Sequence, residues 1–141
     1  MKNLRYLPLI IMAALLLGSC NKDDEHKKAV QTLCSRLWSS HTVTDNGLPS
    51  LVDCMYADEL TFNTNGGGNR HYRLKCDPDD PENVPLQWSL SPDARTLSVS
   101  NFEGDQKKTT QMKVFSLSRT TLEVEYTNEE GHVIHTVYNG M

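Results

Sequence analysis

Apolar and polar residues alternate along most of this chain, and short turn sequences interrupt the alternation at frequent intervals. The clearest runs are Leu60-Thr61-Phe62, Leu86-Gln87-Trp88-Ser89-Leu90 and Leu122-Glu123-Val124-Glu125-Tyr126. A period of two places the apolar side chains of an extended strand on one face and the polar side chains on the other. Because one face is apolar and the other polar, the sheet is expected to curl around its own core.

About eight runs are predicted as strands. They are Trp38–Thr44, Glu59–Thr64, Arg70–Cys76, Leu86–Leu90, a run through Leu97 and Val99, Gln111–Leu117, Leu122–Tyr126 and His132–Tyr138. Most connections, such as Asp45-Asn46-Gly47 and the glycine-rich Asn65–Asn69, are short enough for hairpins. Because no helix is predicted between strands to make a parallel crossover, we predict a mainly β fold, an antiparallel eight-stranded meander barrel.

One short helix is predicted before the barrel. The residues Val30, Leu33, Cys34, Leu37 and Trp38 recur at the three-and-four spacing of a single helical face. This spacing predicts an amphipathic helix from Glu25 to Arg36, with Asp23 or Asp24 as its N-cap. Cys34 lies on the apolar stripe, where a buried small side chain is expected.

The chain begins with a leader that resembles a secretion signal. Lys2 and Arg5 precede an apolar stretch from Leu7 to Leu17, which as a helix would span about 16 Å, too short to cross a bilayer core of roughly 30 Å. The following tetrad Leu17-Gly18-Ser19-Cys20 resembles the lipobox of bacterial lipoproteins. The resemblance implies that residues 1–19 are a signal peptide and that Cys20 is acylated, which would anchor the protein to a membrane.

Residues 20–28 are interpreted as the acylated cysteine and a charged tether, and residues 29–141 as one barrel domain. The sequence Lys22-Asp23-Asp24-Glu25 resembles the export signal of surface lipoproteins in one Gram-negative phylum. This resemblance implies an outer-membrane lipoprotein displayed at the cell surface. The periplasmic face of that membrane is the alternative.

Three cysteines remain in a compartment that permits disulfides. Cys54 lies just before one predicted strand, and Cys76 ends the next, so the two lie near the open ends of one predicted hairpin. Residues at these ends are neighbours across the pair, and we therefore predict a disulfide between Cys54 and Cys76. Cys34 is left as the odd thiol.

The rhythm of these strands resembles the lipocalin-like domains of secreted and surface lipoproteins from gut-associated Gram-negative bacteria. The residues that carry the resemblance are Trp38, Cys54 before Asp58-Glu59-Leu60-Thr61-Phe62, Cys76, Trp88-Ser89-Leu90 followed by Leu97, and Leu117-Ser118 followed by Thr121-Leu122. They span roughly Leu33 to Tyr138. The resemblance implies a calyx-type barrel that can hold an apolar molecule.

Several kinds of chemistry find no support in the sequence. The leader holds Lys2 and Arg5 and no acidic residue, so its removal changes the net charge from −4 to −6, and no basic stripe suggests nucleic-acid binding. His132 and His135 would lie on opposite faces of a strand, and no Cys-x-x-Cys pair suggests a metal site. No nucleophile or phosphate-loop motif is present, so we expect neither an enzyme nor a cofactor.

Four aromatic residues on the predicted apolar faces are candidates for ligand contact: Phe62, Tyr72, Trp88 and Tyr126. Their alternative role is core packing, because side chains alone can fill a barrel of this size. We therefore predict a non-catalytic binding module for a small apolar or amphipathic ligand. The alternative is an accessory or inhibitory protein that contacts a protein partner through loops Asn65–Asn69 and Asp77–Pro85.

Overall fold

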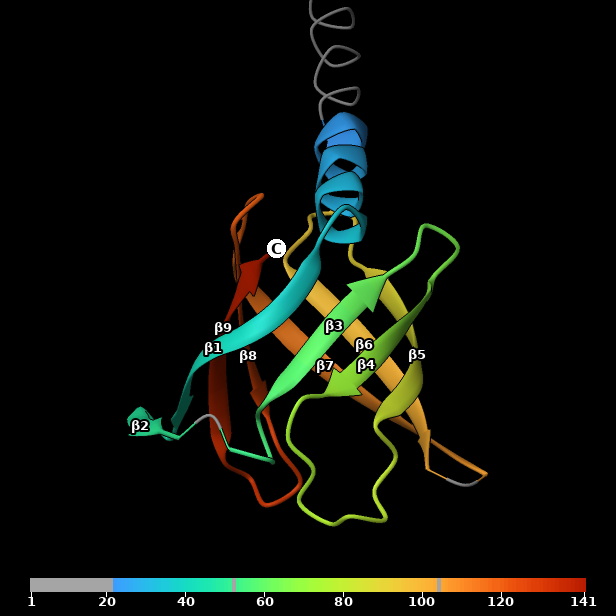
Figure 1. Cartoon of the computed structure of the whole chain (residues 1–141). Helices are drawn as coiled ribbons and strands as arrows, with labels where there is room; N and C mark the ends of the chain where they lie inside the picture. The colour runs from blue at the N-terminus through green and yellow to red at the C-terminus, as the bar shows by residue number, and fades with distance from the viewer. Residues whose placement is uncertain (1–21, 52, 104) are drawn as a thin grey trace, which may run out of the picture.

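The computed structural model describes residues 22–51, 53–103 and 105–141 (Figure 1). The predicted signal peptide and Cys20 lie outside these ranges. Within them the chain forms one helix, residues 22–34, and nine strands. The strands are β1 (Leu37–Asp45), β2 (Leu48–Ser50), β3 (Asp58–Phe62), β4 (Gly67–Tyr72), β5 (Asn83–Leu90), β6 (Thr96–Glu103), β7 (Gln106–Leu117), β8 (Thr121–Thr127) and β9 (Val133–Gly140).

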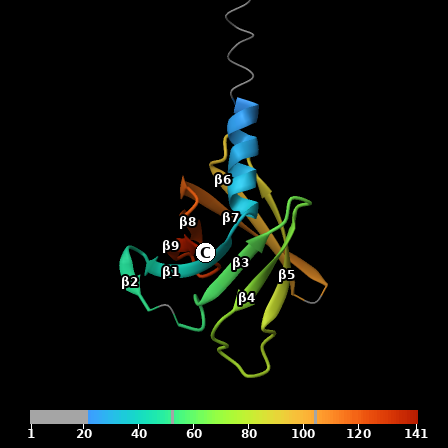
Figure 2. The same cartoon turned by 45° about the horizontal axis from the view of Figure 1, so that its top comes forward.

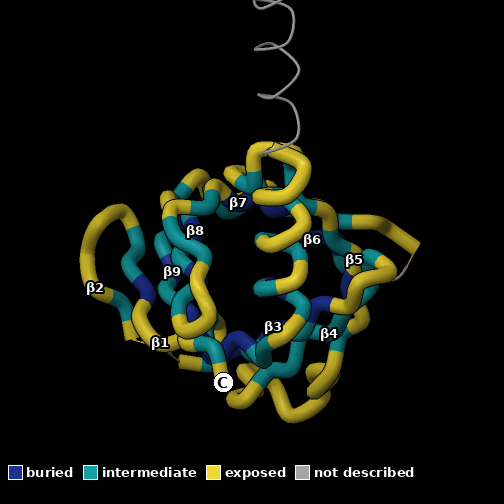
Figure 3. Tube along the Cα trace, turned by 90° about the horizontal axis from the view of Figure 1, so that it is seen from above, coloured by how far each residue is buried: buried dark blue, intermediate teal, exposed yellow. Residues whose placement is uncertain are grey.

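Eight of these strands close into an antiparallel barrel, so the predicted fold class is confirmed. Each strand from β3 to β9 pairs with the next along the chain, and β1 joins the two ends of this series by pairing with both β3 and β9. Figure 3 shows the resulting ring from the helix end. Closure leaves the barrel with one inner face, on which the alternating apolar side chains meet.

Strand β2 lies outside the ring and is a strand that the sequence did not predict. Residues 37–39 of β1 pair with β3, whereas residues 43–45 pair with β2. The intervening turn is the predicted Asn-Gly turn, in which Asn46 and Gly47 have φ angles of 49° and 80°. Two consecutive positive φ angles are typical of a two-residue hairpin. With three residues, one of them Pro49, β2 is too short to show an alternating pattern.

The boundaries of β4 correct the predicted strand Arg70–Cys76. The strand runs from Gly67 to Tyr72, so glycines that were assigned to a turn belong to the strand, and Cys76 lies in the loop beyond it. Gly68 faces Phe62 of β3. A Cβ atom at Gly68 would lie 2.2 Å from the carbonyl oxygen of Thr61, so this close approach of two backbones requires glycine. The loop Asn65–Asn69, predicted as a contact site for a protein partner, is shorter than predicted because residues 67–69 belong to β4.

The helix closes one end of the barrel, where it stands on the ring of strands (Figures 1 and 2). Leu33 is fully buried, and the indole nitrogen of Trp38 donates a hydrogen bond to its carbonyl oxygen at 2.8 Å. The helix is already formed at Lys22 and ends at Cys34, whereas the sequence predicted Glu25 to Arg36 after a tether. Residues 22–25 are exposed, so no apolar pattern marks them as helical.

The core fills the half of the barrel beneath the helix. Its largest fully buried side chains come from five strands and the helix: Leu33, Trp38, Leu60, Phe62, Leu97, Met112, Leu122 and Val124. Ile134 is also fully buried, but it pairs with Asp45 at the other end of β1, outside this cluster. Phe62 and Trp88 contact each other edge to face, with ring centroids 5.5 Å apart. In the described ranges, no helix combines the length and apolarity that a bilayer span requires.

Candidate ligand-binding site

The end of the barrel opposite the helix contains a cavity of about 540 Å³, the mouth cavity. Tyr72, Val84 and Asn101 line it from the inner faces of β4, β5 and β6. The strand register assigns them to this face, since directly paired residues point to the same side of a sheet. Tyr72 pairs with buried Asp58, and Asn101 pairs with buried Leu86, two residues beyond Val84.

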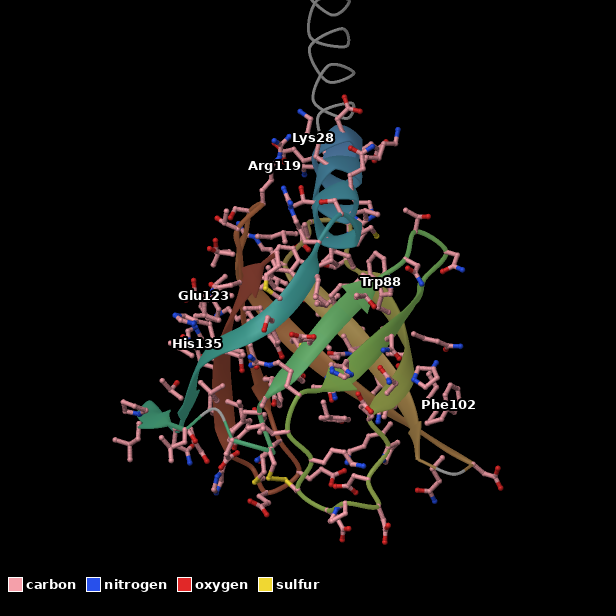
Figure 4. The ribbon with its side chains drawn as sticks, viewed as in Figure 1. Lys28, Trp88, Phe102, Arg119, Glu123 and His135 are labelled. Carbon is pink, nitrogen blue, oxygen red and sulfur yellow. A yellow bond between two sulfur atoms is a disulfide. The ribbon has the colours of Figure 1, made fainter. Side chains whose placement is uncertain are left out.

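Apolar side chains make up much of the wall of the mouth cavity. Met55, Leu74, Pro81 and Phe102 extend the surface of Val84 outward, and Met55, Leu74 and Phe102 are each at least half exposed. Figure 4 shows Phe102 near the open end, whereas Trp88 lies near the helix end. Lys75 and Asp80 add charged groups to this wall. A small-molecule site usually combines an apolar wall with a few polar groups.

A disulfide joins two loops at the rim of this cavity. Cys54 and Cys76 are bonded, with Cα atoms 4.9 Å apart, which confirms the predicted pairing. Both residues line the mouth cavity. The backbone of Arg73 donates a hydrogen bond to the carbonyl oxygen of Ala57 at 2.8 Å, and its guanidinium donates to the carbonyl oxygen of Ser40 at 2.8 Å. These bonds hold the loop after β4 against β1 and the chain before β3.

Cys34 is the free cysteine among the described residues, as predicted. Its side chain packs against the core at the helix end. Burial raises the pKa of its thiol. A thiol with a raised pKa is mostly protonated at neutral pH and is therefore a poor nucleophile.

A second, smaller cavity of about 60 Å³, the inner cavity, lies inside the barrel and is mostly polar in its lining. Its lining residues are Met55, Tyr56, Asp58, Arg70, Tyr72, Tyr126, Thr136 and Tyr138. Nε of Arg70 lies 3.2 Å from Oδ2 of Asp58 in an ion pair, although its N–H is not directed for a hydrogen bond. The hydroxyl of Tyr138 donates to the same carboxylate oxygen at 3.5 Å.

Burial dominates the electrostatics of the inner cavity. It raises the pKa of the Asp58 carboxyl, against the opposing effect of the Arg70 guanidinium. It also raises the pKa of Tyr126 to about 12 and that of Tyr138 well above its ordinary value. Both tyrosines therefore keep their protons at neutral pH and act as hydrogen-bond donors.

The four predicted ligand residues divide between the two halves of the barrel. Tyr72 lines both cavities and Tyr126 lines the inner one. Phe62 belongs to the core, and the indole nitrogen of Trp88 donates to the carbonyl oxygens of Asn63 and Gly67 at 3.0 and 2.9 Å. A ligand-binding role stays a prediction for all four.

Asp58 and Arg70 are residues of this site that the sequence reasoning missed. A signal was present, since Asp58 shares the face of Leu60 and Phe62 in an alternating run. A charged residue on an apolar face has to find a partner inside the protein. The partner of Asp58 could not be predicted, because the strand predicted after the glycine turn began three residues late. The register between the two strands was therefore not defined.

Other ionic groups lie around the mouth and on the outer wall. Nζ of Lys108 lies 2.8 Å from Oε1 of Glu129 at the open end. Nε2 of His135 lies 2.9 Å from Oε1 of Glu123 on the outer face. Across the ranges that the structure covers, no three His, Cys, Asp or Glu residues are grouped as metal ligands.

The family model described as Lipocalin-like domain matches residues 37–124. The match covers more than half of the chain and runs from β1 into β8, so the protein belongs to this family. Members of the family are typically non-catalytic binding proteins. A search of curated proteins finds no match to the chain.

Proposed function

We propose that the protein is a non-catalytic module that binds a small apolar or amphipathic molecule in the mouth cavity. The observation that carries this proposal is the cavity of about 540 Å³ at the open end, whose wall is more apolar than polar. Small-molecule sites typically enclose roughly 300–1,000 Å³ and carry few polar groups. The disulfide at the rim limits the movement of two wall segments, which reduces the entropy lost when a ligand binds.

The proposal includes an anchor at Cys20 on the outer membrane, with display at the cell surface. The chain enters the helix at the end farthest from the barrel (Figure 1). The residues that line the mouth cavity lie at the other end of the barrel. An acyl group two residues before Lys22 would therefore direct the mouth cavity away from the membrane. Intact-mass measurement of protein purified from its host would test the anchor through the added mass of the acyl groups. Labelling of whole cells would separate surface display from periplasmic retention.

The ligand proposal is tested by filling the mouth cavity. Val84→Trp places a large side chain in the cavity, and we expect it to abolish binding of an environment-sensitive apolar dye by the purified protein. Val133→Trp is the matched control, since Val133 is exposed and lies outside the mouth cavity. Equal dye binding by wild type and Val84→Trp would reject the mouth as the site. As an independent measurement, native mass spectrometry of protein purified from its host would detect a retained ligand directly.

Interaction with a protein partner through the loops stays an alternative prediction. The feature relevant to it is β2, the terminal strand of the sheet order, which begins at the exposed Leu48 and is followed by the exposed Leu51. Exposed strand edges can pair with another chain. Replacement of Leu48 and Leu51 by serine would weaken such a complex and leave dye binding unchanged.

A further inference from the structure

We propose that the ligand binds with an uncharged polar end in the inner cavity, as a hydroxyl or amide, and with its apolar body in the mouth cavity. This inference rests on the proposed function and adds the orientation and chemical class of the ligand. It follows from the position, the hydrogen-bonding groups and the charge of the inner cavity.

The two cavities adjoin each other. Met55 and Tyr72 line both, so one molecule can extend from the mouth into the inner cavity. The inner cavity extends to Thr136 and Tyr138 on β9, while the mouth cavity is bounded by β4, β5 and β6. Beyond the inner cavity the barrel is filled by the core, and Tyr138 belongs to that core cluster. A ligand that enters from the mouth therefore meets polar groups at its deepest point.

The inner cavity offers both donors and acceptors. Asp58 accepts hydrogen bonds, and the hydroxyls of Tyr126 and Thr136 can donate or accept. The hydroxyl of Tyr126 donates no hydrogen bond to another residue in the described part of the chain. This hydroxyl lines the inner cavity, so a ligand that supplies an acceptor can receive its hydrogen bond.

The charge of the cavity selects an uncharged group. Arg70 is positively charged and Asp58 is negatively charged, and Nε of Arg70 lies 3.2 Å from Oδ2 of Asp58. The two charges therefore already balance each other. A carboxylate or an ammonium would add an uncompensated charge, and moving a charge out of water is expensive. A volume of about 60 Å³ admits a few water-sized groups and thus a hydroxyl or an amide, but no large head group.

The apolar side chains lie where the body of such a ligand would rest. Leu74, Val84 and Phe102 line the mouth cavity, outside the polar inner cavity. The reverse orientation would place an apolar chain against the charged groups of Asp58 and Arg70, which is unfavourable. The molecule that fits both cavities has a short uncharged polar end and one apolar chain.

The test compares ligands of equal chain length by calorimetric titration of the purified protein. The series is decanol, decanamide, methyl decyl ether, decanoate and decylammonium at neutral pH. We expect decanol and decanamide to bind about fivefold to tenfold more tightly than the ether, as one added hydrogen bond allows. Decanoate and decylammonium should bind more weakly than decanol. A tighter affinity for either ion, or equal affinities for decanol and the ether, would overturn the inference.

Tyr126→Phe removes one hydroxyl from the inner cavity and keeps the ring. It should weaken decanamide binding about fivefold, because the amide oxygen loses the hydroxyl that donates to it. Thr136→Val gives a second deletion of a hydroxyl at similar volume. If both variants weaken all five compounds equally, the polar end does not occupy the inner cavity. If no compound binds the wild type, the proposed function itself fails. Loss of binding in Val84→Trp with no difference between decanol and the ether would retain that function and reject only the orientation.

Discussion

Gly68 is the residue at which the backbone geometry of the barrel is most restrictive. An added Cβ atom would lie 2.2 Å from the carbonyl oxygen of Thr61 and 2.8 Å from Cδ1 of Leu86. Gly67→Ala is a matched control, because its Cβ atom would meet the flexible Asn65 side chain at 3.2 Å. We expect Gly68→Ala to lower the free energy of unfolding by about 2–3 kcal/mol and Gly67→Ala to lower it much less. Urea unfolding measures both, and equal losses would contradict the assigned approach of β3 and β4.

Asp58 should make stability depend on pH. Burial raises the pKa of its carboxyl above the ordinary 3.8, although Arg70 acts in the opposite direction. With a raised pKa the folded protein binds the proton more tightly, so the stabilisation is present below pH 3.8 and is lost as the pH rises through the raised value. The unfolding free energy of the wild type relative to Asp58→Asn should therefore fall as the pH increases above about 4. If the stability of the wild type relative to Asp58→Asn rises with pH instead, the effect of Arg70 on the pKa of Asp58 outweighs the effect of burial.

Individual residues differ in how far the sequence alone could place them. Trp38 was predicted on an apolar face and is fully buried. The ion pair of Asp58 and Arg70 was not predicted, because it depends on which residues of β3 and β4 lie opposite each other. That register follows from the turn of residues 63–66, where Gly66 has a φ of 84°. The glycine-rich composition predicted a turn there without fixing its length.

At the scale of the elements, the type of each segment was easier to predict than its ends. The alternation in β8 and the helical spacing around Leu33 both correspond to observed elements. Strand β7 begins at Gln106, five residues before the predicted Gln111, since its first residues are mostly polar and exposed. Those residues pair with β6, and backbone pairing leaves no apolar pattern in the sequence.

The disulfide stabilises the two loops that form the rim of the mouth cavity. Its residues are separated by 22 positions, and by loop-closure entropy such a bond contributes about 3 kcal/mol. We expect the double variant Cys54→Ser, Cys76→Ser to lose about this amount in denaturant unfolding and to bind the apolar dye more weakly. The single variant Cys34→Ser serves as the control for loss of a thiol. A double variant as stable as the wild type would show that neighbouring contacts hold the rim without the bond.

At the scale of the whole molecule, closure of the barrel was predictable and the cavity was not. Alternating strands with short connections and a single apolar face leave few arrangements other than a closed antiparallel sheet. The same alternation predicts which side chains point inward, but it does not predict how much of the interior they fill. The filled half lies beneath the helix, and the inward side chains of the other half, among them Tyr72, Val84 and Asn101, leave the mouth cavity between them.

The central claim, that the open half of the barrel holds a small amphipathic molecule, is tested most directly by an NMR titration of the purified protein with decanol. The account predicts saturable shifts of the backbone amide signals of Met55, Leu74 and Val84, with little change at Leu33 and Leu97 beneath the helix. Saturation with the largest shifts on the outer wall around Glu123 and His135, or no shifts at concentrations that keep decanol dissolved, would contradict it.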